Sequence, residues 1–235
     1  MHLPNSRAIF VLAIAAFGFL AIFDRRIGLP GMIVAAALFA GIELWQHFDY
    51  RRISQQWLRA ASLRPIVLRS PLEGTWKVSS GGPDPRHNHH AGRQDQYFGY
   101  DFVRANGDSF DQPVVAPVAG MIAHVENRQP DAAPNEPSRN KKRPLGNYVS
   151  IETPRGYVIL AHLKRGSVVV RVGDTVTIGH SIARSGNSGT TKSAHVHVHG
   201  QDRPSENPDA AQGVPIAFAA NEHAEPLLLE YGDAL

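Results

Sequence analysis

The chain has 235 residues, of which 19% are charged, and a formal net charge of +3. This length allows one medium-sized domain plus an accessory segment, and the net charge is too small to suggest a nucleic-acid partner. The absence of cysteine excludes disulfides and cysteine-based zinc sites, so any metal must be held by His, Asp or Glu.

Two uncharged runs, residues 8–23 and 27–42, lie near the N-terminus and are separated by Asp24-Arg25-Arg26. Each is slightly shorter than the roughly 20 residues that cross a bilayer as a helix, and each becomes long enough when its flanks are included. We therefore predict a membrane segment over residues 1–48, formed as a two-helix hairpin. A signal segment followed by one span, or two buried helices of a soluble domain, are the alternatives.

Residues 49–64 are polar and arginine-bearing with helical spacing, which predicts a juxtamembrane linker. Positive charges favour the cytoplasmic side of a membrane. Arg25 and Arg26 therefore favour a cytoplasmic turn and an extracytoplasmic C-terminal domain. The more numerous arginines on the outer flanks favour the reverse, and these are Arg7, Arg51, Arg52, Arg59 and Arg64.

From residue 65 to 235, short apolar runs alternate with turn signals, which predicts a mostly β domain with a compact antiparallel sandwich or barrel-like fold. The expected strands cover residues 66–68, 98–104, 114–125, 148–152, 157–162, 168–172, 180–184 and 195–200. Residues 129–144 form a polar insertion with prolines and a basic run. We expect this insertion to be a solvated loop or a rim that contacts substrate.

Residues 193–200 have the sequence SAHVHVHG and give the strongest functional signal. Side chains two apart in a strand point to the same face, so His195, His197 and His199 would share one face while the intervening valines join a core. Histidine is the commonest metal ligand and a frequent acid or base near neutral pH. The pattern therefore indicates the wall of a metal site.

Other segments supply further candidates. Asp101 lies among aromatic residues, where a carboxylate is costly unless it is paired or bound to a cation. His162 ends an apolar strand, and residues 186–189 form a Gly-Asn-Ser-Gly turn. One carboxylate and two imidazoles suffice for a catalytic zinc site with an open position for water. Additional histidines beside such a site can transfer a proton or stabilise an oxyanion.

With these motifs, residues 88–200 resemble the lysostaphin/LytM-type zinc endopeptidases, which cut peptidoglycan cross-bridges. Asp101 matches the early aspartate of that family and His162, in Ala-His-Leu, matches its middle histidine. The turn at 186–189, followed by His195 and His197, matches its glycine turn and His-x-His motif. The resemblance implies a zinc ion (Zn2+) as cofactor, Asp101 and His197 as ligands, and His162 and His195 as catalytic residues.

The first ligand departs from the family pattern. Four residues before Asp101 the family has histidine, whereas this chain has Tyr97, whose phenol titrates near pH 10 and is a poor ligand at neutral pH. We expect His90 to supply the imidazole instead, with His89 as the alternative. His199 stands where the family has another residue, and we expect a surface or structural histidine there rather than a partner of a ligand.

The resemblance implies a membrane-anchored metalloendopeptidase of bacteria that hydrolyses amide bonds in peptidoglycan peptide stems or cross-bridges. Its domain would lie on the periplasmic or extracytoplasmic side, with the wall peptide and the membrane as partners. The alternative is a non-catalytic module of the same fold that binds the wall or activates another hydrolase, as the Tyr97 departure suggests. A lysine-modified carrier barrel is disfavoured, because Lys164 and Lys192 lack the expected flanks.

Overall fold

The structure is a computed structural model that describes residues 25–204 and 210–235. The first predicted membrane run, residues 8–23, lies outside the described residues. The chain divides into two compact units, Met1–Ile53 and Ser54–Leu235. The second unit carries all of the predicted chemistry.

A single helix, α2 (Arg25–Ala61), runs through both the second predicted membrane run and most of the predicted linker. Its apolar half is rich in alanine, leucine and isoleucine, and alanine and leucine are strong helix formers. Within the described part of the chain, Pro30–Ala61 of this helix is long and apolar enough to cross a membrane. A signal sequence has the same length and apolar character, so α2 fits either a membrane span or a signal segment.

The last turns of α2 belong to the Ser54–Leu235 unit because of Trp57. Its side chain is 1% exposed, and its Nε1 donates a hydrogen bond of 3.0 Å to the Tyr97 carbonyl. The indole ring also contacts the rings of Phe98 and Tyr100. The compact unit therefore begins before residue 65, where the sequence placed the start of the β domain.

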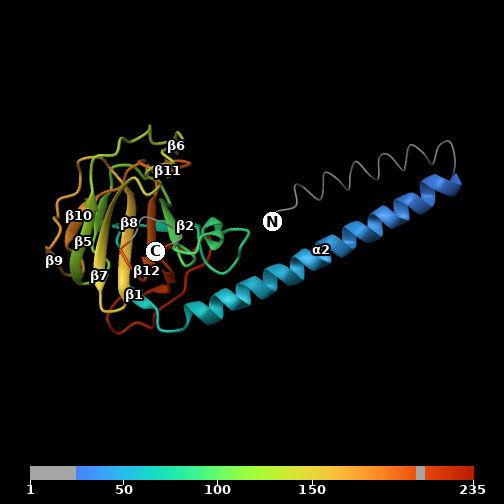
Figure 1. The fold of residues 1–235 in the computed structure, drawn as a ribbon, viewed down its shortest axis with the longest axis horizontal. Coiled ribbons are helices and arrows are strands. Elements are labelled where there is room, and N and C mark those ends of the chain that lie inside the picture. The colour runs from blue at the N-terminus through green and yellow to red at the C-terminus, as the bar shows by residue number, and fades with distance from the viewer. Residues whose placement is uncertain (1–24, 205–209) are drawn as a thin grey trace. The chain divides into compact units, whose positions relative to one another are not determined.

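One eight-stranded sheet dominates this unit (Figure 1). Its strand order is β2-β3-β12-β8-β7-β5-β9, with β13 pairing beside β12, and every pairing is antiparallel. The prediction of a mostly β fold with antiparallel sheets is confirmed. The strands are β2 (Trp76–Ser80), β3 (Tyr100–Arg104), β5 (Gly120–Glu126), β7 (Asn147–Thr153), β8 (Gly156–Leu163), β9 (Thr175–Val176), β12 (Val196–Gln201) and β13 (Gly213–Val214).

Three two-stranded pairs accompany this sheet. They join β1 (Ile66–Leu68) to β14 (Ile216–Phe218) in parallel, β4 (Pro113–Val115) to β10 (Ser181–Arg184), and β6 (Ser138–Arg139) to β11 (Thr190–Thr191). The expected strand 114–125 is split into β4 and β5. The expected strand 168–172 is absent, because Val172 is exposed and Arg171 begins a turn whose carbonyl accepts from the Asp174 amide.

The insertion at 129–144 is exposed or partly exposed along its whole length, as expected of a solvated loop, and it is also bonded to the turn at 186–189. Asp131 accepts a 2.8 Å hydrogen bond from the Asn187 amide. The Asn187 side chain donates to the carbonyls of Ala133 and Glu136. These bonds, together with the β6–β11 pairing, fix the insertion against the segment that leads into β12.

Candidate metal centre and cleft

Two predicted ligands, Asp101 and His197, are cross-strand partners. Asp101 in β3 pairs directly with His197 in β12, and directly opposed residues place their side chains on the same face of the sheet. Both side chains are buried, and His197 Nδ1 lies 2.8 Å from Asp101 Oδ1. On the other face, Val196 and Val198 join the core, as the alternation predicts.

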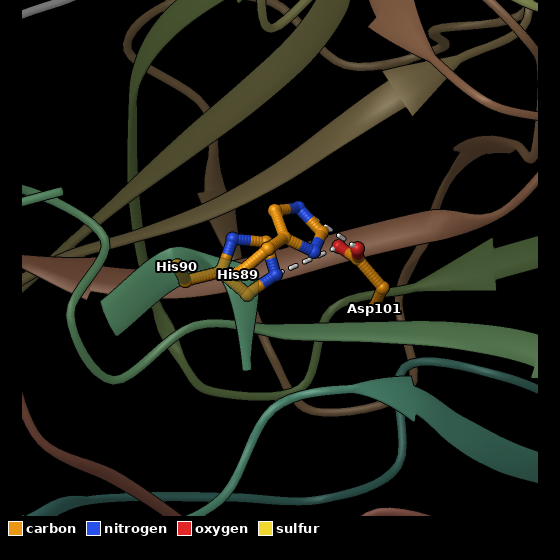
Figure 2. A group of neighbouring side chains, drawn as sticks. All are labelled: His89, His90 and Asp101. Atoms are coloured by element: carbon orange, nitrogen blue, oxygen red, sulfur yellow. Dashed lines mark ion pairs between the residues drawn. The ribbon is translucent and has the colours of Figure 1, made fainter. Parts of the chain in front are cut away.

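The third predicted ligand comes from a short 3-10 helix, η1 (His89–Gly92). Asn88 caps this turn by accepting a 3.0 Å hydrogen bond from the His90 amide, and its side chain donates to the Gly82 carbonyl. The cap turns the His90 ring inward, where it is 3% exposed and its Nε2 lies 3.2 Å from Asp101 Oδ1. Figure 2 shows the His89 and His90 rings facing the Asp101 carboxylate.

His89 and Tyr97 are placed differently from His90. The His89 side chain is 62% exposed, with its Nε2 3.6 Å from Asp101 Oδ2 and its Nδ1 2.7 Å from Ser80 Oγ. One potential ligand atom from each of His89, His90 and Asp101 lies within 4.8 Å of the others. Tyr97 is half-buried against Phe98 and is not among the residues that line the cleft.

The chemistry of this cluster fits a bound cation. Both ring nitrogens of His90 are buried without a hydrogen-bond partner, which is costly unless another group satisfies them. Burial by itself raises the pKa of Asp101, but the charges of the nearby His90 and His195 hold it well below its usual value. A buried carboxylate between imidazoles is a donor set that zinc accepts.

His162 reaches the same site from the end of β8, through a bulge in the sheet. Asn147 pairs with Leu163 and Tyr148 pairs with Ala161, which leaves His162 as the extra residue. Its φ of 61° is a left-handed conformation, unfavourable for a residue with a Cβ. Hydrogen bonds hold it there, from its amide to the Leu145 carbonyl and from the Gly186 amide to its own carbonyl. Such bulges re-aim side chains beside active sites.

The His162 ring is oriented by the turn at 186–189. Its Nδ1 lies 2.9 Å from the Ser188 carbonyl, which can only accept, so Nδ1 carries the hydrogen and Nε2 keeps a lone pair. Burial lowers the pKa of His162 to about 3, so the ring is neutral at pH 7. Ser188 is itself fixed, since its Oγ donates to the Leu163 carbonyl and accepts from the Asn147 amide.

His195 lies just before β12, close to both Asp101 and His162. Its Nδ1 is 2.8 Å from the Ser193 carbonyl and its Nε2 is 3.5 Å from Asp101 Oδ1. Burial alone would lower the pKa of His195, but the attraction of Asp101 raises it overall. The His162 and His195 rings are 4.6 Å apart. Two neighbouring groups whose pKa values are pushed apart can divide the roles of base and acid.

His199 is buried and bonded, so the expectation of a surface histidine is wrong, whereas that of a structural histidine stays open. The side chain is 0% exposed, and its Nδ1 lies 2.8 Å from His197 Nε2. Its Nε2 lies 3.0 Å from Gln201 Oε1. Burial lowers the pKa of His199 to about 4. Sequence reasoning missed Gln201, although it continues the two-residue alternation of the histidines along β12.

These side chains lie in an open groove of about 500 Å³. Pro144 and Leu145, at the end of the insertion, form part of its wall, and Lys192 lies on the segment between β11 and β12. A second hollow of about 390 Å³ lies beside this groove and shares Val103 and Ser193 with it.

Fold and site together define a β-sheet protein with a buried His/Asp cluster in a groove, the arrangement of a metal-dependent hydrolase. Residues 96–208 match the model of Peptidase family M23, so the chain carries a domain of this peptidase family. An uncharacterized metalloprotease of Haemophilus influenzae is 31% identical over 130 residues, which are 55% of this chain and 23% of that protein. The chain thus matches about a quarter of that relative's length.

Solved structures are also similar to this chain over about half its length. The antimicrobial peptidase lysostaphin from Staphylococcus simulans is 23% identical, with 49% of this chain and 40% of that chain covered and a TM-score of 0.35. A zinc-containing peptidase from Vibrio cholerae is 20% identical, with 56% and 33% covered and a TM-score of 0.33. The catalytic domain of the M23 protein EnpA from Enterococcus faecalis is 19% identical, with 50% and 73% covered and a TM-score of 0.36.

Proposed function

We propose that this protein is a zinc-dependent endopeptidase that hydrolyses amide bonds in peptidoglycan peptide stems or cross-bridges. The observation that carries the proposal is the convergence of His90, Asp101 and His197 in the groove, where the ring nitrogens of His90 have no hydrogen-bond partner. His90, Asp101 and His197 would hold the zinc ion. His89 is the weaker candidate because its ring is largely exposed and already bonded to Ser80.

A bound zinc ion supplies a Lewis acid and lowers the pKa of a bound water to about 7. The other histidines divide the proton chemistry. His162 is neutral and its Nε2 lone pair is available to accept a proton from the attacking water. His195, with its raised pKa, is suited to donate a hydrogen bond to the developing oxyanion and a proton to the leaving amine,.

The wall peptide would lie extended along the groove, between the η1 side and the wall formed by Pro144 and Leu145. The N-terminal helical segment would anchor the enzyme in the membrane, with the β domain on the extracytoplasmic side where the wall is. The non-catalytic alternative rested on Tyr97, and the 3.2 Å approach of His90 Nε2 to Asp101 Oδ1 supports the catalytic proposal instead.

Fragment release from purified peptidoglycan tests the proposal. The full-length protein with zinc is expected to release soluble peptides, and His197→Ala is expected to abolish both release and zinc binding. His223→Ala is the matched control, because that ring is exposed and lies outside the groove. Zinc binding without release from a folded wild-type protein would contradict the activity, and release by the folded His197→Ala variant would contradict the site.

A further inference from the structure

A chain of hydrogen bonds leads from the proposed metal site into the protein along one face of β12. His197 Nε2 is 2.8 Å from His199 Nδ1, and His199 Nε2 is 3.0 Å from Gln201 Oε1. The Gln201 amide nitrogen then donates a 2.7 Å hydrogen bond to the Arg203 carbonyl. All three side chains of the relay are buried, so the hydrogen positions within it are mutually dependent.

The donor and acceptor roles in this series of hydrogen bonds are set at its far end, at Arg203. The Arg203 carbonyl can only accept, so the Gln201 side chain must present its nitrogen to Arg203 and its oxygen to His199. That oxygen also only accepts, which places the hydrogen of a neutral His199 ring on Nε2. Nδ1 of His199 then carries a lone pair and accepts from Nε2 of His197.

The consequence appears at the metal site. A neutral His197 ring with its hydrogen on Nε2 has a lone pair on Nδ1, and Nδ1 lies 2.8 Å from Asp101 Oδ1. Two acceptors at this distance repel each other unless a cation lies beside both. The alternative places hydrogens on both nitrogens of His199, which puts a positive charge on a ring that is 0% exposed, and burying such a charge is costly.

We propose that His199 and Gln201 are positioning residues that fix the ring tautomer of His197 with its Nδ1 lone pair directed at the metal site. This inference rests on the proposed zinc site. Outer partners that fix the tautomer of a metal-bound histidine typically change metal affinity 10- to 100-fold when they are removed. Here the outer partner is a second histidine, itself held by an amide, on the same face of the same strand.

Zinc affinity of the full-length protein, measured by competition with a chelating indicator, tests the proposal. Gln201→Leu removes the acceptor and is expected to weaken zinc binding by about 10- to 100-fold. Val198→Ala is the matched control, since Val198 lies on the same strand but faces the core, so its loss of packing should leave zinc affinity unchanged.

A second readout does not depend on the variants folding. Long-range ¹H–¹⁵N spectra of the zinc-loaded wild-type protein are expected to show His199 with hydrogen on Nε2 only and His197 with hydrogen on Nε2. Hydrogen on Nδ1 of His199, or equal zinc affinity in wild type and folded Gln201→Leu, would overturn this inference alone. Absence of zinc binding by the wild-type protein would instead overturn the proposed function on which it rests.

Discussion

Replacing His90 by leucine should raise the stability of the metal-free protein while removing its response to zinc. The His90 ring is buried with neither nitrogen partnered, and each such group costs about 1–3 kcal/mol. Two opposing effects reduce the gain, namely the lost 3.2 Å approach to Asp101 and an imperfect fit of leucine, about 1 kcal/mol. We expect a net gain of about 1–3 kcal/mol in the free energy of unfolding.

Zinc should make the wild-type protein more stable than the His90→Leu variant. At a free zinc concentration of 100 times its Kd, the wild-type protein gains about 2.7 kcal/mol, whereas a variant that lacks one of three ligands gains much less. Thermal unfolding followed by near-UV circular dichroism, with and without zinc, measures both effects. Each kcal/mol corresponds to about 2–4 °C in Tm for a unit of this size.

His89→Leu is the matched control for this experiment, because the His89 ring is largely exposed. Its Tm should change by little in either state, since exposed substitutions usually stay within about 0.5 kcal/mol, and it should still respond to zinc. A metal-free His90→Leu protein that is less stable than wild type would refute the reasoning about unpartnered nitrogens. A full zinc response in that variant would refute the ligand role of His90.

Three further perturbations test other parts of the structure. The metal-free protein should lose stability as pH falls below 6.5, because the folded-state pKa values of His162 and His199, about 3 and about 4, lie below the value in the unfolded chain. The unfolded chain then binds more protons, and the free energy of unfolding falls by roughly 1.4 kcal/mol per pH unit for each ring. A Tm that stays constant from pH 7 to 5 would contradict this. Trp57→Ala should cost about 3–5 kcal/mol in chemical denaturation, and a fragment of residues 65–235 should be destabilised relative to 54–235; equal stability of the two fragments would argue against the contacts of Trp57 with the β domain. Gly99→Ala should weaken zinc binding, because the added Cβ would lie 3.1 Å from Cε1 of His197 and 3.0 Å from the Gln96 carbonyl; unchanged affinity in isothermal titration would show that the ring has room to move.

The alternation of residues along β12 determined much of the site from the sequence alone. Histidines and valines two apart specify one polar and one apolar face without any tertiary information, and the structure places Val196 and Val198 in the core accordingly. Turn residues and short apolar runs were equally sufficient to predict a mostly β domain. These are local properties of the chain, set by side-chain spacing and backbone preference.

Contacts between distant segments were decided only by the tertiary structure. The register that sets Asp101 opposite His197 joins residues far apart in the sequence, and no local pattern encodes which residues of two strands face each other. The different exposure of His89 and His90 goes with the cap at Asn88, where one ring turns inward and the other stays exposed.

The same reason accounts for the elements that the sequence missed. Residues 168–172 have strand-like composition, and the Val169 amide donates to the Ile182 carbonyl in β10, but the structure assigns no strand there and the segment ends in a turn. His199 became a partner of His197 because the two side chains share one face of β12 and both are buried. Composition and spacing specify what each segment can do, whereas burial and pairing, which depend on the whole fold, decide which of those possibilities is realised.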